Sequence, residues 1–310
     1  MKRDLDALLR GARAGNVRDI ARLISLVEDG SEQVPALMAA LGQASTALVI
    51  GVTGSPGVGK STSTSALISA YRQRGKRVGV IAVDPSSPFS GGALLGDRIR
   101  MQDHATDPGV YIRSMASRGH LGGLSATTTQ ALRVLEGVGF DVIIIETVGV
   151  GQSEVEVAGA ADTTLVLLAP GMGDGIQAAK AGILEIGDIL VVNKADRDGA
   201  DVTARELRTM VTLGDHPEGA WKPPVLKTVA AKGEGVDDVV TAIAEHRSWL
   251  EQSGELQARR VRRARDEVEA ILVARLREKW SRNGSLDAAA DRIARGETDA
   301  YSVAESLLGS

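Results

Sequence analysis

The segment Gly54–Ser61, which reads GSPGVGKS, constrains the fold of this chain more than any other segment. It follows the apolar run ALVIGVT and precedes a stretch of helical composition, so it predicts a strand, a tight turn and a helix. In such a turn the glycines let backbone N–H groups converge on phosphate oxygens, and the helix N-terminus favours negative charge. The predicted phosphate-binding residues are Gly54, Ser55, Pro56, Gly57, Val58, Gly59, Lys60, Ser61 and Thr62.

A second segment, Asn193–Asp196, reads NKAD and predicts how a base is recognised. The Asp196 carboxylate can accept hydrogen bonds from N1–H and the exocyclic amine of guanine, two donors that adenine does not present in this geometry. ATP would leave this carboxylate unpaired, and sites built on such hydrogen bonds reject the wrong ligand by roughly 10⁴-fold. The two segments together therefore predict a site for guanine nucleotides.

Further contacts to the base are expected around the same segment. Asn193 is expected to tie the base to the phosphate loop, and the stem of Lys194 to lie across the purine plane. The downstream segment 228–235, TVAAKGEG, would bring the Ala231 N–H to guanine O6 and Lys232 to the other face of the ring. The predicted guanine-binding residues are Asn193, Lys194, Asp196, Ala231 and Lys232.

The central region alternates apolar runs with stretches of helical length, and this alternation predicts the fold class. The runs are ALVIGVTG, RVGVIAVD, DVIIIETVG, TTLVLLAPG, ILVVNKAD and PVLKTVA. Continuous β-branched runs suit parallel strands that are buried on both faces. We therefore predict an α/β fold with a doubly wound, mostly parallel sheet, whose ligands gather at the carboxyl ends of the strands. Asp84 ends RVGVIAVD, Glu146 ends the apolar part DVIIIE of its run, and Asn193 follows ILVV.

Magnesium is the expected cofactor, with GTP as substrate and GDP as product. Mg²⁺ prefers hard oxygen ligands, and phosphoryl transfer asks mainly for positioning and charge neutralisation. The candidate metal ligands are Ser61, Asp84, Asp97 and Glu146. Acidic residues at strand ends can also cap helices, so this alternative stays open for the three carboxylates. Lys60 is a predicted catalytic residue because it would neutralise charge on the phosphates.

A clear water-orienting residue is missing from the sequence. Gln152 stands three positions after Gly149 and not directly after it, so its role is unassigned. We therefore predict slow intrinsic hydrolysis and a partner that completes the site.

Three regions are expected along the chain. Residues 1–45 predict a helical N-terminal extension, residues 46–250 the nucleotide-binding domain, and residues 251–310 a C-terminal helical arm. The stretch 259–265, RRVRRAR, is followed at once by DEVEAILVARLREKW, so it is interpreted as a solvated helix face of mixed charge, with a projecting dimer arm as the alternative.

Composition excludes several classes of function. The formal net charge of −4 gives no global field for holding nucleic acid, and the absence of cysteine excludes disulfides and thiolate metal sites. The four histidines, at positions 104, 120, 216 and 246, do not cluster, and each is expected to be an ordinary surface or loop residue. No continuous hydrophobic segment for export or membrane insertion is found at the N-terminus, so a cytoplasmic location is expected.

Several longer segments resemble one family. GVTGSPGVGKST, AVDPSSPFSGGALLGDRIRM, SRGHLGGLS, ETVGVGQSE, APGMGDGIQ and VVNKAD closely resemble the G-protein chaperones of adenosylcobalamin-dependent methylmalonyl-CoA mutase. These chaperones are known as MeaB in bacteria and MMAA in human mitochondria. The family has also been labelled ArgK, a supposed arginine and ornithine (LAO/AO) transport ATPase or kinase. The resemblance covers nearly the whole chain and implies a P-loop GTPase fold of the SIMIBI type.

Site roles follow from the resemblance by position. Glu146 stands where many GTPases have the Asp of DxxG, which implies a switch residue and adds Glu146 to Lys60 as a predicted catalytic residue. Asp84 and Asp97 match acidic positions near the metal and switch region. Segment 170–180, PGMGDGIQAAK, matches the segment that couples nucleotide state to the mutase, which nominates Asp174, Gln177 and Lys180. Its alternative is a glycine-rich turn that enters a helix.

The resemblance also implies partners. The GTPase would gate delivery of adenosylcobalamin to methylmalonyl-CoA mutase, or a related acyl-CoA mutase, and ejection of damaged cofactor. Family members form homodimers through a C-terminal helical arm, which residues 255–280 would supply. Nothing in the chain resembles a cobalamin-binding module, so the cofactor would be held by the partner.

Other classes of function compete with this one. An ATP-dependent arginine/ornithine transport ATPase or kinase is the main alternative, and NKAD argues against it. A metal-delivery GTPase conflicts with the absence of cysteine and of a histidine cluster. A protein-targeting GTPase would need a Met-rich groove, which six scattered methionines do not supply.

Overall fold

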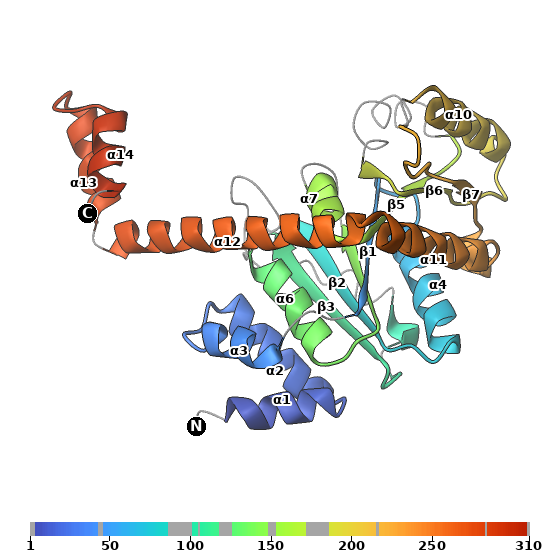
Figure 1. Cartoon of the computed structure of the whole chain (residues 1–310), viewed down its shortest axis with the longest axis horizontal. Helices are drawn as coiled ribbons and strands as arrows, with labels where there is room; N and C mark the ends of the chain where they lie inside the picture. The colour runs from blue at the N-terminus through green and yellow to red at the C-terminus, as the bar shows by residue number, and fades with distance from the viewer. Residues whose placement is uncertain are drawn as a thin grey trace. The chain divides into compact units, whose positions relative to one another are not determined.

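A seven-stranded parallel sheet forms the centre of the computed structural model (Figure 1). The structure describes residues 4–42, 46–85, 101–104, 106–117, 126–147, 153–171, 186–214, 217–282 and 284–308. The strand order is β3-β2-β4-β1-β5-β6-β7. The strands are β1 (Leu48–Gly54), β2 (Val78–Pro85), β3 (Val110–Ser117), β4 (Val142–Thr147), β5 (Thr163–Leu168), β6 (Ile189–Val192) and β7 (Val225–Lys227). The predicted doubly wound parallel sheet is confirmed.

The register of the central strands places the predicted motifs at one edge of the sheet. β1 pairs with β4 and with β5, and Val52 lies opposite Glu146 in the first pair. From β1 the chain passes to β2 and β3 on one side, whereas β5, β6 and β7 extend on the other. The carboxyl end of β1 therefore lies at a topological switch point, where open parallel sheets bind their ligands.

Helices cover both faces of the sheet (Figure 1). On one face α4 (Lys60–Gln73) and α11 (Val236–Ser253) pack over a core that includes Ile50, Val52 and Ile144. The opposite face carries α6 (Ala126–Gly137), α7 (Ser153–Ala160) and α10 (Ala200–Leu213). Because both faces are covered, every residue of β1, β4 and β5 is buried except Leu48, which is half-buried, as their uninterrupted apolar runs require.

Three short helices precede the sheet. They are α1 (Leu5–Arg13), α2 (Val17–Glu28) and α3 (Val34–Leu41). The side chains of Asp4 and Asn16 cap α1 and α2 by accepting hydrogen bonds from backbone N–H groups. Apolar residues such as Leu23 and Ile24 share one core with α6, so this predicted helical extension packs onto the sheet domain.

The C-terminal region consists of α12 (Glu255–Arg282), α13 (Ser285–Ala294) and α14 (Ala300–Leu308). Contacts divide the chain into two compact units, Met1–Val261 and Arg262–Ser310, and the division falls inside α12. The start of a separate arm at residue 251 stays a prediction. No described residue of α13 or α14 is buried, and no described helix is long and apolar enough to cross a membrane.

Two histidines differ from the expectation that each is a surface or loop residue. His246 lies inside α11 and is fully buried, and His104, at the end of the 3-10 turn η1 (Gln102–His104), is also buried. His104 Nε2 lies 2.9 Å from Ser65 Oγ of α4. Both rings lie against polar partners that are distant in the sequence, and the spacing of the histidines does not reveal these contacts. Positions 120 and 216 lie outside the described residues.

Candidate nucleotide site

The phosphate loop joins β1 to α4, as the sequence predicts. Gly54 and Gly59 have φ angles of 139° and 98°, which only glycine adopts without strain. A Cβ atom at Gly54 would overlap the Leu167 carbonyl, and one at Gly59 would overlap the Asn193 amide. Glycine is therefore required at both positions by conformation and by space.

The Lys60 side chain folds over this loop. It is buried, and its ammonium donates to the carbonyl oxygens of Gly54 and, at 3.3 Å, Ser55. Because Lys60 is also the first residue of α4, its charge adds to the positive end of the helix dipole. The loop thus concentrates positive potential where backbone N–H groups can meet an anion.

Ser61 and Glu146 form the next contact along the carboxyl edge. The Ser61 hydroxyl donates to Glu146 Oε1 at 2.6 Å, and both side chains are buried. Two hard oxygens therefore lie side by side next to the phosphate loop. Among the described residues no group of three His, Cys, Asp or Glu side chains could hold a metal ion by itself. A metal here would need ligands from the nucleotide, from water or from residues beyond those described.

Five predicted residues cannot be placed in this way. Asp84 lies in β2, but its side chain is not described, whereas Asp97, Asp174, Gln177 and Lys180 lie outside the described residues.

Asn193 connects three segments at the end of β6. Its amide Nδ2 donates to the Val58 carbonyl at 2.9 Å. Its Oδ1 accepts from the Thr228 hydroxyl at 3.1 Å and from the Ala230 N–H at 3.1 Å. A single buried side chain thus joins the phosphate loop, the NKAD segment and the segment after β7. The role of Thr228 was missed at the sequence level, although TVAAKGEG begins with it.

Lys194, Asp196 and Lys232 are more exposed and surround the space beside this junction. Lys194 has a left-handed φ of 57°, and its ammonium donates to the Gly57 carbonyl, so its stem spans from NKAD to the phosphate loop. Asp196 Oδ2 lies 3.3 Å from Lys232 Nζ, and these side chains are 44% and 57% exposed. The Asp196 carboxylate therefore remains open to a ligand.

A cleft of about 660 Å³ begins near this group and continues along α4 as far as Gln73 and Asp103. Thr62 of α4 lines one side, and Ala230 and Ala231 of the 3-10 turn η2 (Ala230–Lys232) line the other. Its volume is within the range of ordinary small-molecule sites. The contacts of Asn193 and Lys194 thus bring the NKAD segment to the phosphate loop, and the cleft borders this group at Thr62 and Ala231.

Comparisons with known proteins agree with this arrangement. The family model of the methylmalonyl Co-A mutase-associated GTPase MeaB matches residues 20–285. A protein of Pyrococcus abyssi is 45% identical over 310 residues, covering 98% of this chain and 96% of its own length. GTPase ArgK of Escherichia coli is 38% identical over 257 residues, covering 80% of this chain and 78% of its own.

A solved structure supports the same assignment. The crystal structure of an LAO/AO transport system kinase superposes with a TM-score of 0.70 at 27% identity, covering 98% of this chain and 96% of its own. The resemblance inferred from the sequence motifs is confirmed. The chain belongs to the MeaB family of GTPases, and it hydrolyses GTP to GDP and phosphate.

Proposed function

We propose that this GTPase gates the loading of adenosylcobalamin into methylmalonyl-CoA mutase, or a related acyl-CoA mutase, and protects that enzyme from damaged cofactor. The observation that carries this proposal is the family match over residues 20–285, since the family is described as mutase-associated. The chain would act as a chaperone that reports its nucleotide state to the mutase, while the mutase holds the cobalamin.

In this proposal GTP lies across the carboxyl edge of the sheet. The loop Gly54–Thr62 binds the phosphates, and Lys60 exchanges its contacts to loop carbonyls for the β and γ phosphates. Asp196 reads guanine through N1–H and the exocyclic amine, and the Ala231 N–H meets O6. Lys194 and Lys232 cover the two faces of the ring with their stems.

Magnesium would bind beside Ser61 and Glu146. The donor set fits, because hydroxyl and carboxylate oxygens are the ligands Mg²⁺ prefers and these two are already adjacent at 2.6 Å. Asp84 and Asp97 are further proposed ligands. The ion would supply charge neutralisation for the transferred phosphoryl group, and Glu146 would sense the nucleotide state through its hydrogen bond to Ser61.

Intrinsic hydrolysis is expected to be slow, well below about 1 s⁻¹, because no water-orienting residue is assigned. The client mutase would stimulate it by contacting Asp174, Gln177 and Lys180. A homodimer through the C-terminal arm also belongs to the proposal. Supporting it, α12 to α14 expose apolar side chains such as Val268, Leu272 and Tyr301.

The proposal is tested with purified cobalamin-dependent methylmalonyl-CoA mutase. We expect a complex whose stability differs between GDP and a non-hydrolysable GTP analogue, together with faster GTP hydrolysis in the presence of the mutase. Gln177→Ala should reduce this stimulation and leave the intrinsic rate unchanged. Absence of a complex in every nucleotide state would overturn the proposed client and leave the GTPase assignment intact.

A second function is suggested by the solved relative described as a transport system kinase. An ATP-dependent arginine/ornithine transport ATPase or kinase would have to accept adenine nucleotides. A competition measurement decides between the two, since ATP that displaces GDP at equal concentration would favour the transport function.

A further inference from the structure

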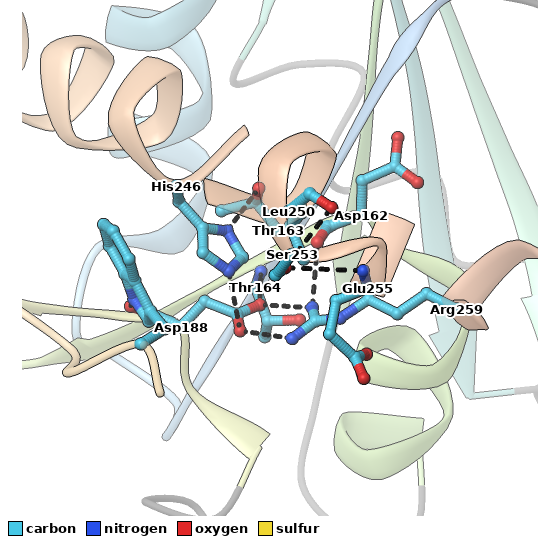
Figure 2. A network of polar contacts seen from close by, with 10 residues as sticks. Asp162, Thr163, Thr164, Asp188, His246, Leu250, Ser253, Glu255 and Arg259 are labelled. Atoms are coloured by element: carbon cyan, nitrogen blue, oxygen red, sulfur yellow. Dashed lines mark hydrogen bonds and ion pairs between the residues drawn. The ribbon is translucent and has the colours of Figure 1, made fainter. Parts of the chain in front are cut away.

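A second polar cluster lies at the amino ends of β5 and β6, on the edge opposite the nucleotide site (Figure 2). Asp162 directly precedes β5 and Asp188 directly precedes β6, and both carboxylates are buried. His246 comes from α11 and Arg259 from the first turns of α12. We call Asp162, Thr163, Asp188, His246 and Arg259 the amino-edge cluster.

Asp188 is the centre of this cluster. Arg259 donates to both of its carboxylate oxygens, from Nη2 to Oδ1 at 2.8 Å and from Nη1 to Oδ2 at 2.9 Å. The Thr164 N–H donates to Oδ2 at 2.8 Å. Arg259 Nη1 also donates to the Asp162 carbonyl at 2.8 Å. A bidentate pair of this kind fixes orientation as well as distance, and here it holds α12 against two strands at once.

The charge that balances Asp188 belongs to Arg259. Although burial works to lower the pKa of Arg259, the hydrogen bonds to Asp188 raise it above its ordinary value. Burial lowers the pKa of His246 to about 4, so this ring is neutral at pH 7. The ring is held by Thr163 Oγ1, 2.9 Å from Nδ1, and its Nε2 lies 3.3 Å from Asp188 Oδ1.

Strand β6 connects this cluster to the nucleotide site. Its four residues, Ile189–Val192, are all buried, and Asp188 and Asn193 flank them on the two sides. β6 is paired with both β5 and β7, and close-packed interiors of this kind transmit strain. Arg259 connects the same cluster to α12, which is one continuous helix from Glu255 to Arg282 and includes the division between the two compact units.

We propose that Asp188 and Arg259 are a positioning pair that couples the nucleotide site, through β6 and Asn193, to the first turns of α12. Nucleotide binding would then change the equilibrium of the Asp188–Arg259 contact by some factor. Because linkage is reciprocal, formation of this contact would change the affinity for nucleotide by the same factor, and that change would be lost with the contact. This inference rests on the proposed placement of guanine nucleotide beside Asn193.

Trp221 provides a reporter for the pair. Its indole N–H donates to the Asp188 carbonyl at 2.7 Å, and its ring centroid lies 4.8 Å from that of His246. The chain has three tryptophans, so a Trp249→Phe, Trp280→Phe background leaves Trp221 as the single indole. Its fluorescence then reports on the backbone of Asp188 and on the neighbouring ring of His246.

The test compares Arg259→Ala and Arg259→Lys with Arg260→Ala in this background. Lysine keeps the charge but loses the bidentate geometry. Arg260 is a matched control because it lies next in α12, is equally exposed at 24%, and approaches Asp162 at 3.7 Å while Arg259 binds Asp188. We expect the Arg259 variants to weaken GDP binding about fivefold or more and to lose most of the Trp221 difference between GDP and GTP analogue. Arg260→Ala should change GDP affinity less than about twofold.

Two outcomes would overturn the inference in distinguishable ways. In the first outcome, the Arg259 variants have a lower melting temperature, but their GDP affinity and their Trp221 signal equal those of Arg260→Ala. The pair would then be purely structural. If Asp196→Asn leaves the preference for guanine unchanged, the proposed base site itself is wrong, and the coupling falls with it. If Arg259→Ala does not fold, Arg259→Lys carries the same comparison.

Discussion

The two edges of the sheet use similar polar residues in opposite ways. At the carboxyl edge, Asp196 and Lys232 are about half exposed and approach at 3.3 Å with a single contact. At the amino edge, Asp188 is buried and Arg259 binds it in a bidentate pair, with a backbone N–H as a further donor. Polar groups at the carboxyl edge can therefore exchange their partners for a ligand, whereas those at the amino edge are bound to each other in a buried pair.

This difference suits the carboxyl edge to binding a ligand and the amino edge to holding α12 against the sheet. An exposed, single-contact ion pair contributes little to stability and is easily replaced by a ligand. A buried pair has already lost its hydration, so removal of one partner leaves an uncompensated charge. Substitutions at the carboxyl edge should therefore act mainly on nucleotide binding and hydrolysis. Those at the amino edge should act mainly on stability and, through the proposed coupling, should weaken nucleotide binding to a smaller extent.

The largest effect is expected at the residue proposed to read the base. Asp196→Asn replaces an acceptor carboxylate with an amide that suits xanthine, so the preference for GTP over XTP should change by about 10⁴-fold. Binding of labelled GDP and XDP, measured on the same preparation, checks this. The melting temperature of the nucleotide-free protein should hardly move, since Asp196 is exposed. Unchanged preference would contradict guanine recognition by Asp196.

Lys60→Ala should give the second largest effect. Loss of its ammonium removes the charge that is proposed to neutralise the transferred phosphoryl group, and we expect GTP hydrolysis to fall about 10³-fold. Single-turnover hydrolysis measures this loss. Lys76→Ala serves as the control, because Lys76 is an exposed residue beyond α4. Equal rates for the two variants would remove Lys60 from the proposed mechanism.

At the amino edge the main effect should be on stability. Asp188→Ala leaves Arg259 without its carboxylate, and the free energy of unfolding should fall by about 3 kcal/mol. Urea unfolding of the nucleotide-free protein provides the measurement. Asp201→Ala is the control, since Asp201 forms an exposed ion pair with Lys227, and its removal should hardly change stability. If both variants lose a similar free energy of unfolding, the buried pair at the amino edge stabilises the fold no more than an exposed ion pair does.

The sequence predicted the carboxyl edge better than the amino edge for a physical reason. GSPGVGKS and NKAD are local patterns at strand ends, so the sheet topology alone brings them together. Asp188 and Arg259 are 71 positions apart, and neither stands in a motif. RRVRRAR was interpreted as a solvated face, yet Arg259 and Arg260 turn toward Asp188 and Asp162. Such a contact depends on where α12 begins, which periodicity does not determine.

His246 gives the smallest effect and one that depends on pH. Its pKa is about 4 in the folded protein, because burial disfavours the charged ring, against about 6.5 in the unfolded chain. Between these values the unfolded chain binds more protons, so stability falls as pH decreases and is fully retained above pH 6.5.

From pH 6.5 to 5 the loss due to His246 should be about 1.5 kcal/mol, because the slope reaches its full 1.36 kcal/mol for each unit of pH only below pH 6.5. His246→Gln keeps a polar side chain at this position but cannot take up a proton, so its stability should depend less on pH in this window. Urea unfolding at several pH values measures the difference in slope. If both proteins lose stability equally between pH 6.5 and 5, the ring is charged or exposed in the folded state. The amino edge would then be open to solvent, as the carboxyl edge is.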